Sequence, residues 1–188
     1  MTFDPFGDYA TRGYLRNSKG LDEQAVKRHE HVAFRLNVDS ALADLKSKSS
    51  LTYEDVLRTH ETLFSSVYPW AGQDRTQTAP NSAIGKGGNY NLFSHPDDSR
   101  RATDMALGMA ADRATMRAKP GEIMGLLAYA PPFLDGNGRT IMTVHADLCR
   151  RAGMHIDWSQ TNKTDYLNAL HRRPSFRDGA GLVERECV

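Results

Sequence analysis

Apolar residues recur at helical spacing over most of the chain and predict a bundle of helices. In the first stretch, from residue 25 to residue 45, their spacing is roughly helical, and a polar break follows at residues 47–50. The second stretch begins after Thr52, a hydroxyl residue with an acid, Asp55, three positions later. That pairing is typical of a helix N-terminus, so a helix is predicted to start there.

Further helices are predicted at residues 98–118, 123–129 and 139–151, with a last helical pattern around residues 166–170. Asp97 and Asp98 suit the positive end of the first of these helices. The second stops at Pro131-Pro132, and Gly153 suits the position just after the third.

Residues 68–92 interrupt this pattern, because glycines and prolines there break any helix. Within them, residues 75–78 and 89–92 are predicted to pair as a short hairpin. The predicted fold class is therefore mainly α, a single-domain helical bundle with a small β-hairpin. One domain, 1–188, would contain a turn-rich segment (1–20), the irregular region (68–92) and a loop with its helix (131–152).

Composition narrows the functional classes. A length of 188 residues suits one domain, and a net charge of +1 creates no general field for nucleic acid or an anionic membrane. No apolar run approaches the ~20 residues that span a bilayer, and no signal peptide is visible. The only cysteines, Cys149 and Cys187, suggest no disulfide framework. We expect a cytoplasmic protein without nucleic-acid or membrane partners; secretion without a cleaved signal stays open.

Polar chemistry is concentrated at residues 131–140, which read Pro131-Pro132-Phe133-Leu134-Asp135-Gly136-Asn137-Gly138-Arg139-Thr140. Gly136 and Gly138 let backbone N–H groups approach a ligand, and the helix that follows presents unpaired N–H groups at its positive end. Arg139 offers a fork-shaped cation for phosphate oxygens, and Asp135 suits a bridging Mg²⁺ ion. Asn137 both donates and accepts hydrogen bonds. The pattern favours a phosphate-binding turn.

Other interpretations of the glycine-rich stretches are weaker. Asn-Gly is a hairpin signal, but here its flanks are helical. A calcium-binding EF-hand loop would need Asp or Asn at position 139 and Gly at position 140, where Arg and Thr stand. The segment Gly85-Lys86-Gly87-Gly88 lacks the second half of a Walker loop. A purely structural turn at residues 135–138 stays open.

Two motifs resemble the Fic (Fic/Doc) family. Residues 132–139 resemble the end of its signature, His-x-Phe-x-Asp/Glu-Gly-Asn-Gly-Arg, and residues 68–76 (Tyr-Pro-Trp-Ala-Gly-Gln-Asp-Arg-Thr) resemble its Trp-Ala-Gly-x-x-Arg segment, which leads into a flap hairpin. Segments 4–17 and 153–158 also look like bacterial members. Because two motifs occur in the right order, the resemblance is specific, and it covers most of the chain.

The resemblance implies an activity and roles for single residues. Family members mostly transfer AMP from ATP to a hydroxyl of a target protein, so ATP (or another nucleotide) and Mg²⁺ are the implied cofactors. By the same resemblance Asp135 would bind Mg²⁺, Asn137 and Arg139 would hold phosphates, and Gly136 and Gly138 would lend N–H groups to the α-phosphate.

The flap, roughly residues 76–91, would align a target protein by strand-like backbone pairing. The flap residues expected to contact the target are Thr76, Ile84, Lys86, Asn89 and Tyr90. The resemblance also implies a small regulatory protein as a partner. Phe133 would anchor the loop in the core, and Tyr68 and Trp70 are expected to be core residues.

Two departures from the family pattern decide the functional expectation. Pro131 stands where the family has the catalytic histidine that takes the proton from the attacking hydroxyl. Loss of such a base typically removes ~10²–10⁴ in rate, so ordinary AMP transfer is predicted to be lost or strongly impaired. Met142 stands where many members carry a second arginine for the distal phosphate.

No other histidine has a sequence feature that identifies it as a substitute base. His145 is turned away from Arg139 around the helix and is expected to be a face or core residue, while nothing in the sequence fixes the distance of His95 from the loop. Many family members are inhibited by a glutamate that pairs with the second arginine. Glu54 lies in a partial match to that motif, but Met142 offers no cation, so this inhibition is predicted to be absent.

Three hypotheses follow. The chain is a degenerate nucleotide-binding protein, or an active transferase with a different donor or chemistry, or a non-enzymatic interaction module whose pocket is vestigial. An engineered or strain-specific Pro131 in an ordinary AMP transferase is a fourth interpretation. The target protein, the true donor and the oligomeric state are not readable from the residues.

Overall fold

The computed structural model describes residues 17–80 and 93–157, and within these ranges the chain is a bundle of helices without an extended strand. The longer helices are α2 (Glu23–Ser47), α3 (Tyr53–Phe64), α5 (Asp98–Ala111), α7 (Pro120–Tyr129) and α8 (Asn137–Arg151), and the short ones are α4 (Arg75–Thr78) and α6 (Arg113–Ala118). The predicted mainly helical class is confirmed. The pattern at residues 166–170 lies outside the described ranges.

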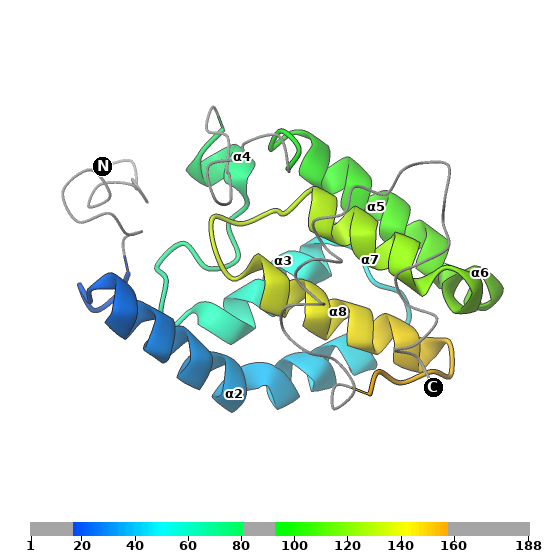
Figure 1. The fold of residues 1–188 in the computed structure, drawn as a ribbon, viewed down its shortest axis with the longest axis horizontal. Helices are drawn as coiled ribbons and strands as arrows, with labels where there is room; N and C mark the ends of the chain where they lie inside the picture. The colour runs from blue at the N-terminus through cyan, green and yellow to red at the C-terminus, as the bar shows by residue number, and fades with distance from the viewer. Residues whose placement is uncertain (1–16, 81–92, 158–188) are drawn as a thin grey trace.

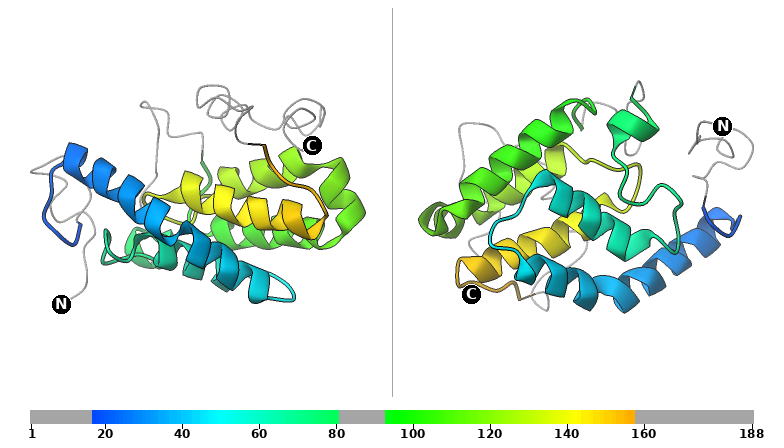
Figure 2. Two further views of the ribbon diagram at one scale, coloured as in Figure 1. Left: turned by 90° about the horizontal axis from the view of Figure 1, so that it is seen from below. Right: turned by 180° about the vertical axis from the view of Figure 1, so that it is seen from behind.

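Helix α8 lies in the middle of the bundle (Figure 1). It packs against α2 and α3 on one side and α7 on the other, and α5 covers α7 (Figure 2). The aromatic side chains of Phe64, Tyr68, Trp70 and Phe133 lie in the shared core, each at most 1% exposed. The expected core positions of Tyr68, Trp70 and Phe133 are confirmed, and these side chains surround the loop that leads into α8.

Local signals at the helix ends act as predicted. Thr52 and Asp55 form a capping box, in which the Asp55 carboxylate accepts hydrogen bonds from the Thr52 N–H and hydroxyl, each at 2.9 Å. Gly153 follows α8 with φ of +75°, as its position after the helix requires. The predicted single helix over residues 98–118 is instead two helices. Asp112 breaks it, because its carboxylate accepts the Thr115 N–H at 2.9 Å and thereby caps α6.

The prediction that residues 75–78 form a hairpin strand is wrong, because they form the helical turn α4. Asp74 caps this turn: its carboxylate accepts the Thr76 N–H at 3.0 Å and also the Thr76 hydroxyl. The other predicted strand, residues 89–92, lies outside the described ranges. A hairpin that begins at Arg75 is therefore excluded.

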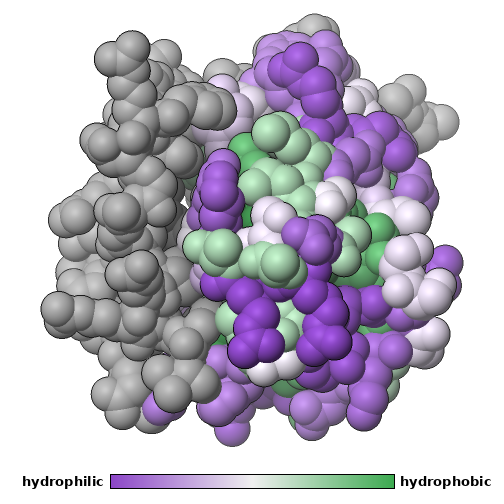
Figure 3. Space-filling view, turned by 90° about the vertical axis from the view of Figure 1, so that its right-hand side faces the viewer, coloured by the Kyte–Doolittle hydropathy of each residue, from purple (hydrophilic) through white to green (hydrophobic). Residues whose placement is uncertain are grey.

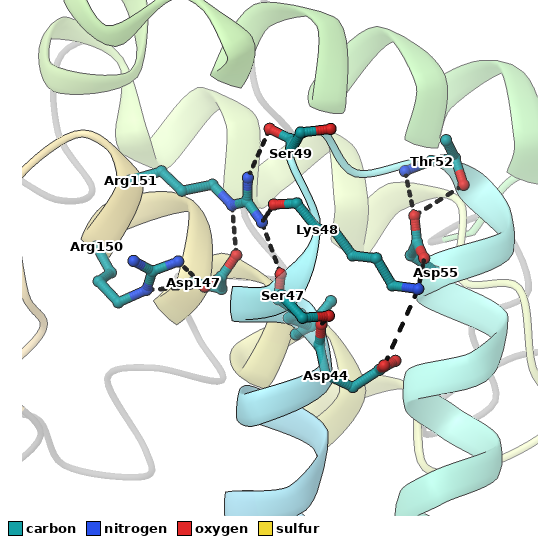
Figure 4. Close-up of polar contacts among 10 residues, drawn as sticks. Asp44, Ser47, Lys48, Ser49, Thr52, Asp55, Asp147, Arg150 and Arg151 are labelled. Atoms are coloured by element: carbon teal, nitrogen blue, oxygen red, sulfur yellow. Dashed lines mark hydrogen bonds and ion pairs between the residues drawn. The ribbon is translucent and has the colours of Figure 1, made fainter.

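The far end of α8 is tied to the turn between α2 and α3 by one guanidinium (Figure 4). Arg151 donates to the carbonyls of Leu45 at 2.7 Å, Lys48 at 2.9 Å and Ser49 at 3.1 Å. These carbonyls lie in the last turn of α2 and in the two residues after it, and the Leu45 carbonyl also accepts the Lys48 N–H at 3.1 Å. The buried carboxylate of Asp147 orients Arg151 through a contact of 2.5 Å. The contact fixes the position of α8 against α2.

At the end of the bundle that carries α6, hydrophobic residues form a patch bordered by hydrophilic ones (Figure 3). Among the helices of residues 17–80 and 93–157, none combines the length and the hydropathy needed to cross a bilayer.

Arg151→Met is expected to lower the free energy of unfolding by about 1–3 kcal/mol, because the α2 carbonyls lose a charged donor. Urea unfolding followed by circular dichroism measures this loss. Arg150→Met is the matched control, since the described contacts of Arg150 are with Asp147 alone and its side chain is 46% exposed. An equal loss in both variants would contradict the role given to Arg151.

Candidate functional site

The loop of residues 131–136 between α7 and α8 is held by donors from distant segments. Arg75, which is 1% exposed, donates its Nε–H to the Pro131 carbonyl at 2.9 Å and its Nη2–H to the Ser94 carbonyl at 3.0 Å. Its backbone N–H donates to the Pro132 carbonyl at 2.7 Å. The arginine of the Trp-Ala-Gly-x-x-Arg segment is therefore a clamp on the loop.

His60 of α3 joins the two sequence motifs. Its Nδ1 accepts the Gly72 N–H at 3.0 Å, so the ring carries its hydrogen on Nε2 and donates it to the Asp135 carbonyl at 3.0 Å. The ring stacks on Phe133 with centroids 3.8 Å apart. Burial lowers the pKa of His60 to about 3, so the ring is neutral at ordinary pH.

Asn137 closes the loop on itself. Its Oδ1 accepts the Phe133 N–H at 2.9 Å, and its Nδ2 donates to the Phe133 carbonyl at 2.7 Å. The role of Asn137 in phosphate binding stays a prediction, and both functional groups of its amide already hold the turn. Pro131 is buried, its carbonyl is taken by Arg75, and its ring carries no titratable group.

The two glycines of the turn have different surroundings. Gly136 precedes α8 with φ of +76°, and a Cβ there would lie 2.8 Å from Phe64 Cε2 and 3.0 Å from His60 Nε2. Only glycine fits that position. A Cβ at Gly138 would meet no atom within 4 Å. The first turn of α8 is therefore open at Gly138, beside N–H groups that have no intrahelical partner.

Arg139 projects from the first turn of α8 onto a buried carboxylate. Its Nη2 lies 2.9 Å from Glu30 Oε1, and its guanidinium lies over the Phe64 ring at 4.9 Å. Glu30 has no exposed side-chain area and also accepts the Tyr68 hydroxyl at 2.8 Å. The Nη1 of Arg139 is buried and has no hydrogen-bond partner among the described residues. The guanidinium is thus fixed in place with one donor unused there.

Both carboxylate oxygens of Asp135, the predicted Mg²⁺ ligand, contact groups of the protein. Its Oδ1 accepts the Gly136 N–H at 2.7 Å, and its Oδ2 is in direct contact with the ammonium of Lys27. Lys27 also lies 3.1 Å from Glu30 Oε2. In the part of the chain that the structure describes, no three His, Cys, Asp or Glu side chains come together to hold a metal. The expected Mg²⁺ ligand is therefore paired with a cation of the protein.

The other histidines considered as a substitute base, His145 and His95, also contact groups of the protein. His145 is buried, as expected, with its Nε2 3.0 Å from the Pro120 carbonyl. His95 is exposed, and its Nδ1 lies 3.3 Å from Asp97 Oδ2. His95 follows Ser94 in the sequence. Arg75 donates one hydrogen bond to the Ser94 carbonyl and another to the Pro131 carbonyl. Glu54 faces solvent and pairs with Arg100 at 2.6 Å.

Sequence reasoning missed three contributors to the site: Lys27, Glu30 and His60. Glu30 lies on the same buried face of α2 as Val26 and Ala33. A charged residue at helical spacing among apolar ones is the feature of the sequence that could have identified it. Of the predicted flap residues, Thr76 lies in α4. The others, Ile84, Lys86, Asn89 and Tyr90, lie outside the described ranges.

Comparisons with known proteins place this arrangement in a family. A profile of the Fic/DOC family matches residues 50–149, more than half of the chain. The chain belongs to the Fic/DOC family.

Two curated relatives carry names that state an activity. The chain is 29% identical over 169 residues to the protein adenylyltransferase VbhT of Bartonella schoenbuchensis, a match that covers 88% of this chain and 35% of VbhT. It is 28% identical over 168 residues to the probable protein adenylyltransferase y4lH of Sinorhizobium fredii, covering 84% of this chain and 82% of that protein. The chain thus spans about a third of the length of VbhT.

Solved structures share the fold. The Bartonella effector protein BepC of Bartonella tribocorum, crystallised with AMPPNP, matches with a TM-score of 0.68 at 18% identity, over 86% of this chain and 85% of that one. The Fic domain of a putative cell filamentation protein of Bartonella quintana, with bound ADP, matches with a TM-score of 0.67 at 21% identity, over 86% and 83%. The helical arrangement described above is therefore the Fic fold.

The two glycines provide a matched pair of variants. Gly136→Ala is expected to lower the free energy of unfolding by about 2–4 kcal/mol, from left-handed strain and the clash with Phe64 and His60. Gly138→Ala is expected to leave it unchanged or raise it slightly, because alanine favours the helix. Chemical denaturation of both variants measures the difference, and equal losses would contradict the described turn.

His60 predicts a pH dependence of stability. Its pKa is lowered from 6.5 to about 3 in the folded protein, so below pH 6.5 the unfolded chain binds a proton that the native ring does not. The stability contribution is present above that pH and declines by about 1.4 kcal/mol per unit as pH falls toward the folded pKa.

Between about pH 7 and about pH 5, wild type should lose about 2 kcal/mol more stability than His60→Gln. Urea unfolding at both pH values measures this difference. The buried His145 is present in both proteins and cancels. Equal pH dependence in the two proteins would show that His60 is not buried in its neutral form.

Proposed function

We propose that this chain is a Fic domain that binds the phosphates of a nucleotide at the start of α8 and is impaired in ordinary AMP transfer. One observation carries the proposal. Arg139 is held by Glu30 and Phe64 at the first turn of α8, with its Nη1 unpaired among the described residues. An oriented guanidinium beside a helix N-terminus suits a phosphate group.

The surroundings of Arg139 support the same ligand. The open space at Gly138 gives an anion room to approach the N–H groups of the first turn. The relatives that are named adenylyltransferases, and the related folds that hold AMPPNP or ADP, support a nucleotide as the source of that phosphate.

Impairment of AMP transfer rests on Pro131. In an AMP transfer the target hydroxyl attacks the α-phosphorus of ATP, pyrophosphate leaves, and the hydroxyl must give up its proton. Pro131 cannot accept that proton, and the neutral ring of His60 has both nitrogens engaged in backbone contacts. His145 is buried against the Pro120 carbonyl. This chain would orient the nucleotide without activating the hydroxyl, so only positioning and electrostatic stabilisation would remain.

Mg²⁺, which the family resemblance implies, would have Asp135 as its protein ligand. When bound, it would neutralise phosphate charge. The donor set here does not fit that role as it lies, because Lys27 occupies the outer oxygen of Asp135. The proposed nucleotide binding is therefore assigned to Arg139 and the start of α8 alone. The flap and its target protein stay predictions.

A second function, transfer with altered chemistry, is favoured by one observation. His95 is exposed next to the carboxylate of Asp97, and its neighbour Ser94 is linked through Arg75 to Pro131. The Nδ1 of His95 lies 3.3 Å from Asp97 Oδ2 and 3.4 Å from the Asp97 N–H, and an exposed imidazole of this kind is a candidate general base. If it serves this chain, any transferred group seen with wild type should disappear in His95→Gln, and mass spectrometry of lysate incubated with several nucleotide donors would show this.

Calorimetric titration with ADP tests nucleotide binding. Arg139→Gln is expected to weaken binding by at least about tenfold, since charge-assisted phosphate contacts contribute on the order of 1.5–3 kcal/mol. Arg150→Gln, at the opposite end of the same helix, is the control and should bind as wild type does. Thermal unfolding checks that both variants are folded. No binding by wild type at millimolar nucleotide would contradict the proposal.

Pro131→His tests the missing base. The variant is expected to gain AMP transfer to protein by about 10²–10⁴-fold over wild type, measured with labelled ATP and lysate. The double variant Pro131→His with Met142→Arg restores both departures from the family pattern. If neither variant gains transfer while nucleotide binding is intact, Pro131 is not the cause of the impairment.

A further inference from the structure

Lys27 is a cation at the candidate site that neither motif contains. It lies on α2, 108 positions from Asp135 in the sequence, and its ammonium contacts the Asp135 carboxylate directly. One turn further along α2, Glu30 lies 3.1 Å from the same ammonium and 2.9 Å from Arg139. Two cations and two carboxylates therefore alternate across the start of α8.

This arrangement competes with a metal ion for one oxygen. A Mg²⁺ ion bound by Oδ2 of Asp135 would compete with Lys27 for that oxygen, while Oδ1 accepts the Gly136 N–H. A divalent ion there would also stand beside an ammonium, and like charges at that separation repel strongly. Lys27 and a metal ion are thus alternative occupants of the same oxygen.

The ammonium of Lys27 lies between two carboxylates. It contacts Asp135 Oδ2 directly and lies 3.1 Å from Glu30 Oε2. An ammonium carries three donors, of which one goes to Asp135 Oδ2, while Glu30 Oε2 forms an ion pair with the ammonium. Among the described residues a donor therefore remains for a further acceptor, and the side chain is 47% exposed.

We propose that Lys27 takes the place of a divalent cation: it neutralises Asp135 and gives its third hydrogen to a nucleotide phosphate, so that this site binds nucleotide without Mg²⁺. The proposal rests on the proposed nucleotide binding at α8. Lys27 would also give the site a second cation, which Met142 does not provide.

Calorimetric titration with ADP, once with Mg²⁺ and once with EDTA, tests the proposal on the full chain. Wild type should bind with dissociation constants that differ by less than about threefold between the two conditions. Lys27→Met should weaken metal-free binding by at least about tenfold, whereas Lys27→Arg should retain it. Lys46→Met, an exposed lysine at the far end of α2, is the matched control and should bind as wild type does.

Asp135→Asn distinguishes most clearly between the Lys27 ammonium and a Mg²⁺ ion as the cation that binds the phosphate. If Lys27 supplies the positive charge that binds the phosphate, this variant binds ADP without metal at least as tightly as wild type does. The reason is that the Lys27 ammonium is no longer paired with the Asp135 carboxylate. If a metal supplies the charge, the variant loses binding. Thermal unfolding of each variant shows that it is folded.

The outcomes distinguish the two proposals. Wild-type binding that requires Mg²⁺ and is lost in Asp135→Asn overturns the role of Lys27 and leaves nucleotide binding intact. Absence of ADP binding with and without Mg²⁺ overturns nucleotide binding and, with it, this inference. Metal-free binding that Lys27→Met leaves unchanged also overturns the inference.

Discussion

The carbonyl groups of one irregular loop impose the constraint on which the rest of the site depends. Residues 131–136 are largely buried and make no helix, so each buried carbonyl needs a donor from elsewhere. Arg75 supplies donors to Pro131 and Pro132, and His60 supplies one to Asp135. These contacts fix where the chain enters α8, and so they fix the direction in which the first N–H groups of α8 point.

The same constraint explains how far the sequence could predict the structure. Helix ends were predicted correctly where the signal is local, as with the capping box at Thr52 and the glycine after α8, because the interacting groups are a few positions apart. Residues 75–78 were predicted wrongly as a strand. The burial of Arg75 depends on carbonyls of residues 94, 131 and 132, which no local pattern reveals.

The candidate site was predictable in part for the same physical reason. The glycine turn and Arg139 follow one another in the chain, so the motif names them. The residues that hold them in place are distant in the sequence. His60, which contacts Asp135, is 75 positions away from it, and Lys27, which also contacts Asp135, is 108 positions away. Charge complementarity between α2 and the loop becomes visible only when the fold brings the two segments together.

The proposed function combines fixed charges with the loss of one base. Glu30 pairs with Arg139 and Lys27 pairs with Asp135, and Pro131 would leave AMP transfer without the histidine that accepts the hydroxyl proton. Titration of ¹⁵N-labelled protein with ADP, followed by amide chemical shifts, tests the central claim most directly. If the nucleotide phosphates bind at the start of α8, the largest shifts occur at the amides of Gly136, Gly138 and Arg139. Shifts confined to another part of the molecule, or none at saturating ADP, would contradict it.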